Sequence, residues 1–140
     1  MKSKTASAFL AAALLAGLAI AESAGAPADD PFARYLYPPD RVMGHSMELG
    51  LDDAQKASIK NEVQKAQGRF VDLQFELQGE SEKMVRLLQE KPVDESRVLA
   101  EVDRILALEK EIKKAQISLL VRIKNVLTPA QQAKLSEMAK

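Results

Sequence analysis

Apolar residues recur at steps of three and four along two stretches of the chain, which predicts two long amphipathic helices. The first stretch runs from Asp53 to about Glu90 and the second from Asp94 to Val126. Gly79 lies within the first stretch and is where we expect a bend. The predicted buried stripes are Ile59, Val63, Ala66, Phe70, Leu73, Leu77, Met84 and Leu88, then Val98, Val102, Ile105, Leu108, Ile112, Leu119, Ile123 and Val126.

A short turn, Lys91-Pro92-Val93-Asp94, separates these two stretches. A residue before proline disfavours the helical conformation, and aspartate is a good N-cap for the helix that follows. Two long helices joined by so short a turn must run antiparallel. The predicted fold is therefore all-α, a long antiparallel helical hairpin with two short flanking helices. One is expected over residues 41–48 and ends at Gly50, and the other lies near the C-terminus.

A nine-residue phrase occurs twice, as LDDAQKASI from residue 51 and as LTPAQQAKL from residue 127. In the second copy Thr128 is a candidate N-cap and Gln131 follows three residues later, which is the arrangement of a capping box. Asp52 and Gln55 take these roles in the first copy. Both phrases predict helix starts, and in an antiparallel hairpin they meet at the end opposite the turn. The predicted capping motifs are Leu51, Asp52, Gln55, Leu127, Thr128 and Gln131.

The first residues follow the pattern of an export signal. Two lysines precede an apolar run from Ala8 to Ala21, which is shorter than the roughly 20 residues that span a bilayer. Small residues stand before Glu22, so we expect cleavage after Ala21. The chain then divides into a signal peptide (1–21), a flexible N-terminal arm (22–40) and the helical hairpin domain (41–140).

Composition excludes several function classes. The chain has no cysteine, so neither disulfides nor thiolate metal sites are available to it. Signal removal takes away Lys2 and Lys4 and leaves 18 basic against 20 acidic residues, which gives no reason to expect nucleic acid as a partner. The only histidine is His45, and no glycine-rich phosphate loop is present. The chain is therefore predicted not to be an enzyme.

Each long helix carries a second apolar pair outside its stripe. Val71 and Phe75 lie well over 90° from the first stripe at about 100° per residue, and Ile117 and Val121 stand apart from the second. We expect the hairpin to bring these pairs to comparable heights. The pairs fit either a homodimer seam or a surface that binds unfolded chains. A modest basic patch, which also fits a salt-bridged helix face, consists of Arg69, Lys110, Lys113 and Lys114.

Met43-x-His45-x-Met47 is the candidate metal cluster. Thioethers with an imidazole suit a soft ion such as Cu(I). In an extended segment all three side chains project to one side, whereas in a helix Met43 and Met47 share a face and His45 points away. The simpler interpretation is two packing methionines and a surface histidine.

Together the export signal, the cysteine-free hairpin and the two LTxxQ-type phrases resemble the Spy/CpxP family of periplasmic proteins, over roughly residues 41–138. The phrase LTPAQ at 127–131 fits the family motif completely. LDDAQ at 51–55 departs from it at the threonine position, where Asp52 can cap equally well. The resemblance implies a cradle-shaped, all-helical dimer that shields unfolded envelope proteins or regulates an envelope stress response, with a membrane sensor kinase as one partner.

Related members of this family, zinc resistance-associated proteins and periplasmic heavy-metal sensors, bind transition metals through several histidines, and this chain has one. Two functions therefore stay open. An ATP-independent holding chaperone for unfolded envelope proteins is favoured by the extra apolar pairs. A heavy-metal sensor or resistance protein that binds Cu or Zn weakly is favoured by Met43, His45 and Met47, and neighbouring efflux and two-component genes would support it.

Overall fold

The computed structural model of the protein describes residues 31–32 and 34–138. The predicted signal peptide and residues 22–30 of the predicted arm lie outside this part of the chain. Every helix described below belongs to one compact unit, residues 34–140. Among the described residues, no helix combines the length and the apolar character needed to cross a membrane.

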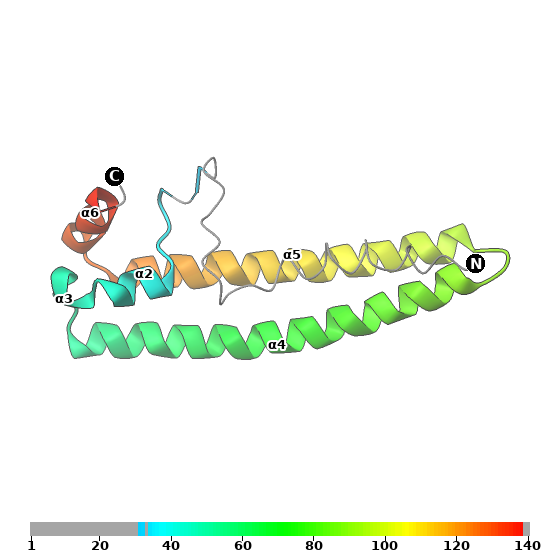
Figure 1. The fold of residues 1–140 in the computed structure, drawn as a ribbon, viewed down its shortest axis with the longest axis horizontal. Helices are drawn as coiled ribbons and strands as arrows, with labels where there is room; N and C mark the ends of the chain where they lie inside the picture. The colour runs from blue at the N-terminus through cyan, green and yellow to red at the C-terminus, as the bar shows by residue number, and fades with distance from the viewer. Residues whose placement is uncertain (1–30, 33, 139–140) are drawn as a thin grey trace, which may run out of the picture. The chain divides into compact units, whose positions relative to one another are not determined.

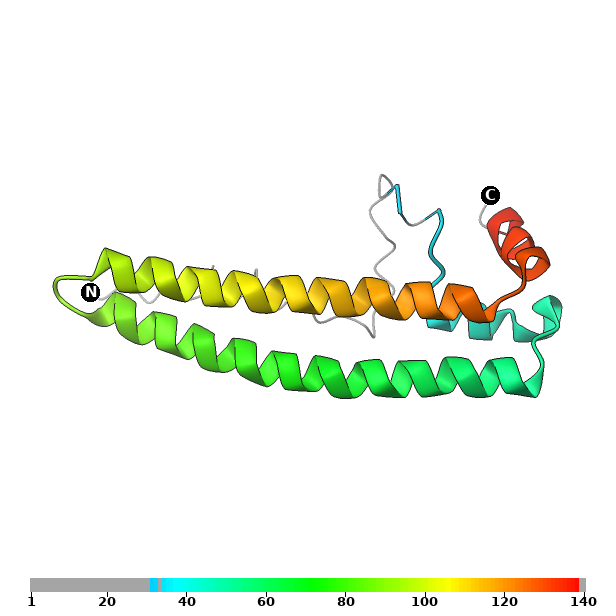
Figure 2. The ribbon, with the colours of Figure 1, turned by 180° about the vertical axis from the view of Figure 1, so that it is seen from behind.

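Two long helices form an antiparallel hairpin, as predicted. Helix α4, Asp53–Gln89, and helix α5, Glu95–Val126, lie side by side along their whole length (Figure 1). Figure 2 shows α4 curving along its length while the helix stays continuous through Gly79, the position of the expected bend. The fold is all-α over the described residues, with helix boundaries within a residue or two of the predicted ones.

The turn of the hairpin is closed by a cap and an ion pair. The Asp94 side chain accepts a hydrogen bond from the Arg97 amide at 3.2 Å, so Asp94 is the N-cap of α5, as expected. The Arg97 guanidinium also reaches back to Glu90 at 2.9 Å, across the turn. The Lys91–Pro92 peptide bond within this turn is cis.

Three short helices gather at the opposite, open end of the hairpin (Figure 1). They are α2, Pro39–Gly44, α3, Ser46–Leu49, and α6, Pro129–Glu137. The helical segment expected over 41–48 thus begins earlier and is interrupted at His45. Gly50 ends α3 with a φ of 66°, a left-handed conformation that glycine adopts without steric cost.

The main core lies at this open end. Tyr37, which the sequence had placed in the flexible arm, is only 4% exposed, and its hydroxyl lies 2.8 Å from Ser136 Oγ on α6. The Arg41 guanidinium donates to the Leu135 carbonyl at 2.7 Å. The residues around α2 and α6 therefore hold each other in place. The buried core cluster comprises Tyr37, Val42, Leu49, Leu51, Ile59, Leu119, Ile123, Leu127 and Leu135.

Towards the turn, the core thins to one row of buried side chains from α4. The prediction of Leu88 in this row is wrong, since Leu88 is 49% exposed and Leu87 is 6% exposed. After Met84 the row continues with a step of three, which keeps Leu87 on the seven-residue repeat of Leu73 and so on the face of α5. The predicted stripe of α5 is confirmed, because each of its members is buried or half-buried.

Candidate functional site

Two glutamines from the repeated phrases join the helix starts at the open end. The Gln55 amide nitrogen donates to Gln131 Oε1 at 2.8 Å, and the Gln131 amide nitrogen donates to Gln55 Oε1 at 3.2 Å. Both predicted capping boxes are present, with Asp52 capping α4 and Thr128 capping α6. The repetition of the phrase in the sequence therefore corresponds to a reciprocal contact between its two copies.

Each glutamine also satisfies a carbonyl at the end of another helix. Gln55 Nε2 donates to the Val126 carbonyl at 3.0 Å, where α5 ends. Gln131 Nε2 donates to the Leu49 carbonyl at 3.2 Å, where α3 ends. The leucines that begin the two phrases, Leu51 and Leu127, are buried in the same core cluster. The phrases thus build the scaffold, and the surfaces available for binding lie elsewhere.

The four apolar residues predicted outside the stripes are all solvent-exposed on the hairpin, and we name them the mid-hairpin set. Phe75 is the most exposed of them, at 72%. Single exposed apolar side chains are common on proteins, whereas several that gather on one surface mark a binding site. The mid-hairpin set is Val71, Phe75, Ile117 and Val121, with 37–72% of each side chain exposed.

The two pairs of the mid-hairpin set lie at different heights, contrary to the expectation. Two ion pairs between the long helices, Glu62 with Arg122 at 3.0 Å and Lys83 with Glu101 at 3.2 Å, fix one register. In that register the pair on α4 lies about eight residues closer to the turn than the pair on α5, which is about 12 Å at 1.5 Å per residue. The set is therefore staggered along the hairpin.

Phe75 borders a groove of about 510 Å³ that crosses both long helices. Helix α5 contributes the apolar residues Ala107 and Leu108 to this groove, together with Arg104. Its other polar lining is acidic. The carboxylates are those of Glu76, Glu80 and Glu111. The groove is therefore lined by apolar side chains together with one cation and three carboxylates.

The predicted basic patch is exposed and uncompensated. Within the described part of the chain, Arg69, Lys110, Lys113 and Lys114 form no ion pair and no side-chain hydrogen bond. A salt-bridged helix face, the alternative interpretation, is thus not what these residues make. Their charges are available to an acidic partner.

A second exposed apolar group near the turn was missed by the sequence analysis, and we name it the turn-end set. Leu99 and Leu106 are each 54% exposed and lie seven residues apart, hence on one face of α5. That seven-residue spacing outside the main stripe was the signal that could have revealed them. The turn-end set is Val85, Leu88, Leu99 and Leu106, each about half exposed.

A buried carboxylate ties the two helices together beside the Phe75 groove. Glu101 of α5 is fully buried, and its Oε2 lies 3.2 Å from Lys83 Nζ and 3.0 Å from Arg104 Nη1. The neighbouring Glu80 carboxyl is the largest influence that lowers the pKa of Glu101; burial opposes it, and Lys83 and Arg104 lower the pKa further. Glu101 is therefore held in its charged form by its neighbours.

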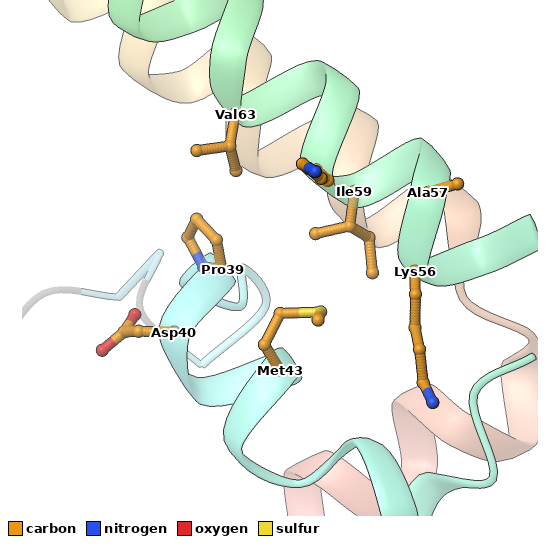
Figure 3. Close-up of a pocket in the computed structure, with 8 residues that line it drawn as sticks. Pro39, Asp40, Met43, Lys56, Ala57, Ile59 and Val63 are labelled. Carbon is orange, nitrogen blue, oxygen red and sulfur yellow. The ribbon is translucent and has the colours of Figure 1, made fainter. Parts of the chain in front are cut away.

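The candidate metal residues occupy three different surroundings. Met43 lines a groove against α4 (Figure 3), whereas Met47 is 92% exposed. His45 Nδ1 is buried without a hydrogen bond, at 3.4 Å from Glu48 Oε1. An imidazole and a carboxylate are fewer ligands than a transition-metal site takes. As these residues lie, the ligand set is incomplete, and the metal site stays a prediction.

A metal site can also be built from histidine and carboxylate side chains alone. Within residues 31–32 and 34–138, no three histidine, aspartate or glutamate side chains gather in a way that could hold a metal ion.

Comparison with known proteins identifies the family. A search of curated proteins found no match, and neither did a search of solved structures. The family model described as heavy-metal resistance matches residues 8–134, which is most of the chain. This range includes both LDDAQ at 51–55 and LTPAQ at 127–131. The protein therefore belongs to the heavy-metal resistance family, which is of the Spy/CpxP-like LTxxQ type.

Proposed function

We propose that the protein is a non-enzymatic, ATP-independent holding chaperone of the periplasm, which binds envelope proteins unfolded during heavy-metal stress. The observation that carries this proposal is the exposed ring of Phe75 beside a groove to which α5 contributes the apolar residues Ala107 and Leu108. The rest of the mid-hairpin set extends the apolar surface along both helices, and family membership supports the link to heavy metals.

The strength of such binding suits a protein that must release its client without a nucleotide. Burying a Val, Ile or Phe side chain fully contributes about 1.5 to 3 kcal/mol, and partial burial contributes less. A staggered set of four such side chains therefore gives weak, reversible contacts. The uncompensated charges of the basic patch add attraction for acidic unfolded segments, which weakens as salt rises.

The test is suppression of aggregation. The mature protein, at a few-fold excess, should keep a reduced and unfolding client in solution without added nucleotide. Phe75→Ser combined with Ile117→Ser should lose most of this effect, because both substitutions remove exposed apolar surface without touching the buried stripes. Phe75→Leu is the matched control, since it keeps an apolar side chain at the same place, and it should retain activity.

Two results would reject the proposal. If the wild-type protein leaves aggregation of the client unchanged, the chaperone function is wrong. If the double variant protects as well as the wild type does, unfolded chains do not bind at the mid-hairpin set.

A second candidate function is a sensor or buffer for Cu(I) or Zn(II), and the family description together with Met43, His45 and Met47 favours it. A metal bound only to the native state raises the melting temperature by mass action. With the chaperone function we expect no rise that depends on His45 when stoichiometric metal is added. A rise in the wild type that is lost in His45→Ala would favour the sensor.

A further inference from the structure

An apolar groove lies between α2 and α4, away from the mid-hairpin set. Figure 3 shows Pro39 and Met43 on α2 facing Ile59 and Val63 on α4. The groove has a volume of about 420 Å³, within the range of sites that take small apolar groups, and it is open to solvent. Met43, 38% exposed at its edge, is a flexible thioether that adapts to different apolar shapes.

Two lysines stand at the rim of this groove without partners. Lys56 and Lys60 lie one helical turn apart on α4, and neither makes an ion pair or a side-chain hydrogen bond within the described part of the chain. The groove also has one acidic residue, Asp40, which Figure 3 shows directed away from the apolar floor. The rim beside the floor therefore carries positive charge.

Several other cations at the open end of the hairpin are, in contrast, engaged. Arg122 pairs with Glu62 at 3.0 Å, and Lys124 donates to the Tyr35 carbonyl at 2.7 Å. Arg41 and Lys134 donate to the carbonyls of Leu135 and Glu48. Lys56 and Lys60 differ from these neighbours, because their charges are not used within the described part of the chain.

We propose that this groove binds a polypeptide segment in which a large apolar side chain is flanked by carboxylates. The apolar side chain enters between Met43 and Val63, and the carboxylates meet Lys56 and Lys60. This inference rests on the proposed function and adds to it a second contact for clients, which selects acidic segments.

The open shape of the groove favours a polypeptide over a free amphiphile of similar chemistry. A long acyl chain laid in an open groove keeps one side in water, so much of its apolar area stays exposed. A single side chain of a polypeptide can enter the groove while the backbone of the polypeptide remains in water. Lys56 and Lys60, spaced by one turn, suit carboxylates on one such segment.

The test uses a short synthetic peptide that alternates glutamate with leucine and carries one central tryptophan. Because the protein has no tryptophan, the emission of the peptide reports binding without background. Lys56→Gln with Lys60→Gln should weaken binding by about three- to tenfold, as expected for two exposed ion pairs, and should reduce its salt dependence. Arg86→Gln with Lys91→Gln removes the same charge near the turn and should leave binding unchanged.

Methyl NMR of the methionines locates the bound peptide. The Met43 methyl signal should shift on addition of the peptide, whereas the signals of Met47, which is 92% exposed, and of buried Met84 should stay in place. A peptide with lysine in place of glutamate should bind far more weakly.

The outcomes separate this inference from the function on which it rests. If the peptide does not bind while the wild type still suppresses aggregation, the groove proposal is wrong and the chaperone proposal stands. If the peptide binds equally to Lys56→Gln/Lys60→Gln, or moves the Met47 signal instead of that of Met43, the groove is not the site. If dodecanoate shifts Met43 and the peptide does not, the ligand is an amphiphile and the polypeptide proposal fails.

Discussion

Gln55 and Gln131 each serve their own helix and a neighbouring one. The oxygen of each side chain accepts from the backbone N–H of its own cap, and the nitrogen reaches a carbonyl at the end of another helix. Buried or half-buried amides that lose such partners leave donors and acceptors unsatisfied, which costs more than the net gain from making the bonds. One glutamine therefore stabilises a junction between several chain segments.

Gln131→Glu should destabilise the protein by about 1 to 3 kcal/mol at neutral pH, because the carboxylate has nearly the same shape but donates no hydrogen bond to Leu49 or Gln55. Chemical denaturation of a chain that begins at Glu22 measures the change. Gln64→Glu, on an exposed face of α4, is the matched control and should change stability little. Equal stability of the two variants would show that the amide contact does not hold the junction.

At the scale of the elements, Glu101 holds the thinner half of the hairpin together. Its carboxylate lies between Lys83 of α4 and Arg104 of its own helix, where the core has one buried row. Since the pKa of Glu101 is lower in the folded protein than in the unfolded chain, the carboxylate stabilises the fold fully above the unfolded pKa, about 4.3 for glutamate. That contribution is lost as the pH falls through the lower, folded pKa.

The hairpin should therefore lose stability on acidification below about pH 4, the region in which Glu101 becomes protonated. Glu101→Gln should lower the melting temperature at neutral pH, since Lys83 and Arg104 lose the carboxylate they share and Lys83 keeps only its longer contact with Glu80 at 3.4 Å, and it should flatten the acid dependence. Melting curves measured from neutral to acidic pH test this. Glu109→Gln, an exposed substitution on the same helix, is the control; an acid slope that is the same in both variants would rule out Glu101 as its source.

At the scale of the whole molecule, we expect the turn-end set to form a seam between two copies of the chain. Leu99 and Leu106 repeat at the seven-residue spacing by which helices pack along one another, and both are about half exposed. Phe75, in contrast, borders a groove lined by apolar and charged residues together, as we expect of a surface that binds changing clients. The two interpretations of the extra apolar residues can thus both apply, to different sets.

We expect the same chain, from Glu22 onward, to sediment as a homodimer at micromolar concentration. Leu99→Ser with Leu106→Ser should weaken the dimer at least about tenfold, since each lost apolar burial is worth more than about 1 kcal/mol. Analytical ultracentrifugation over a concentration series measures this. Phe75→Ser with Ile117→Ser should leave the dimer intact. The reverse result, in which only the latter pair splits the dimer, would make the mid-hairpin set the seam.

The sequence by itself determined the elements and their caps. Helix period, proline and capping residues act within a few positions of the chain, so the boundaries of α4, α5 and α6 and the capping roles of Asp52, Asp94 and Thr128 could be predicted. The antiparallel pairing followed from the short turn, and the exposure of the mid-hairpin set followed from its angle to the stripe.

Only the tertiary structure decided which side chains meet. The choice of Leu87 over Leu88 depends on the direction from which α5 approaches, and the burial of Glu101 depends on cations from two helices. The sequence predicted that the two repeated phrases meet, but the reciprocal hydrogen bonds of Gln55 and Gln131 and the groove at Met43 are seen only in the tertiary structure. Local periodicity fixes the face a residue occupies, but the register between helices is set by the sum of many long-range contacts, which no short stretch of sequence contains.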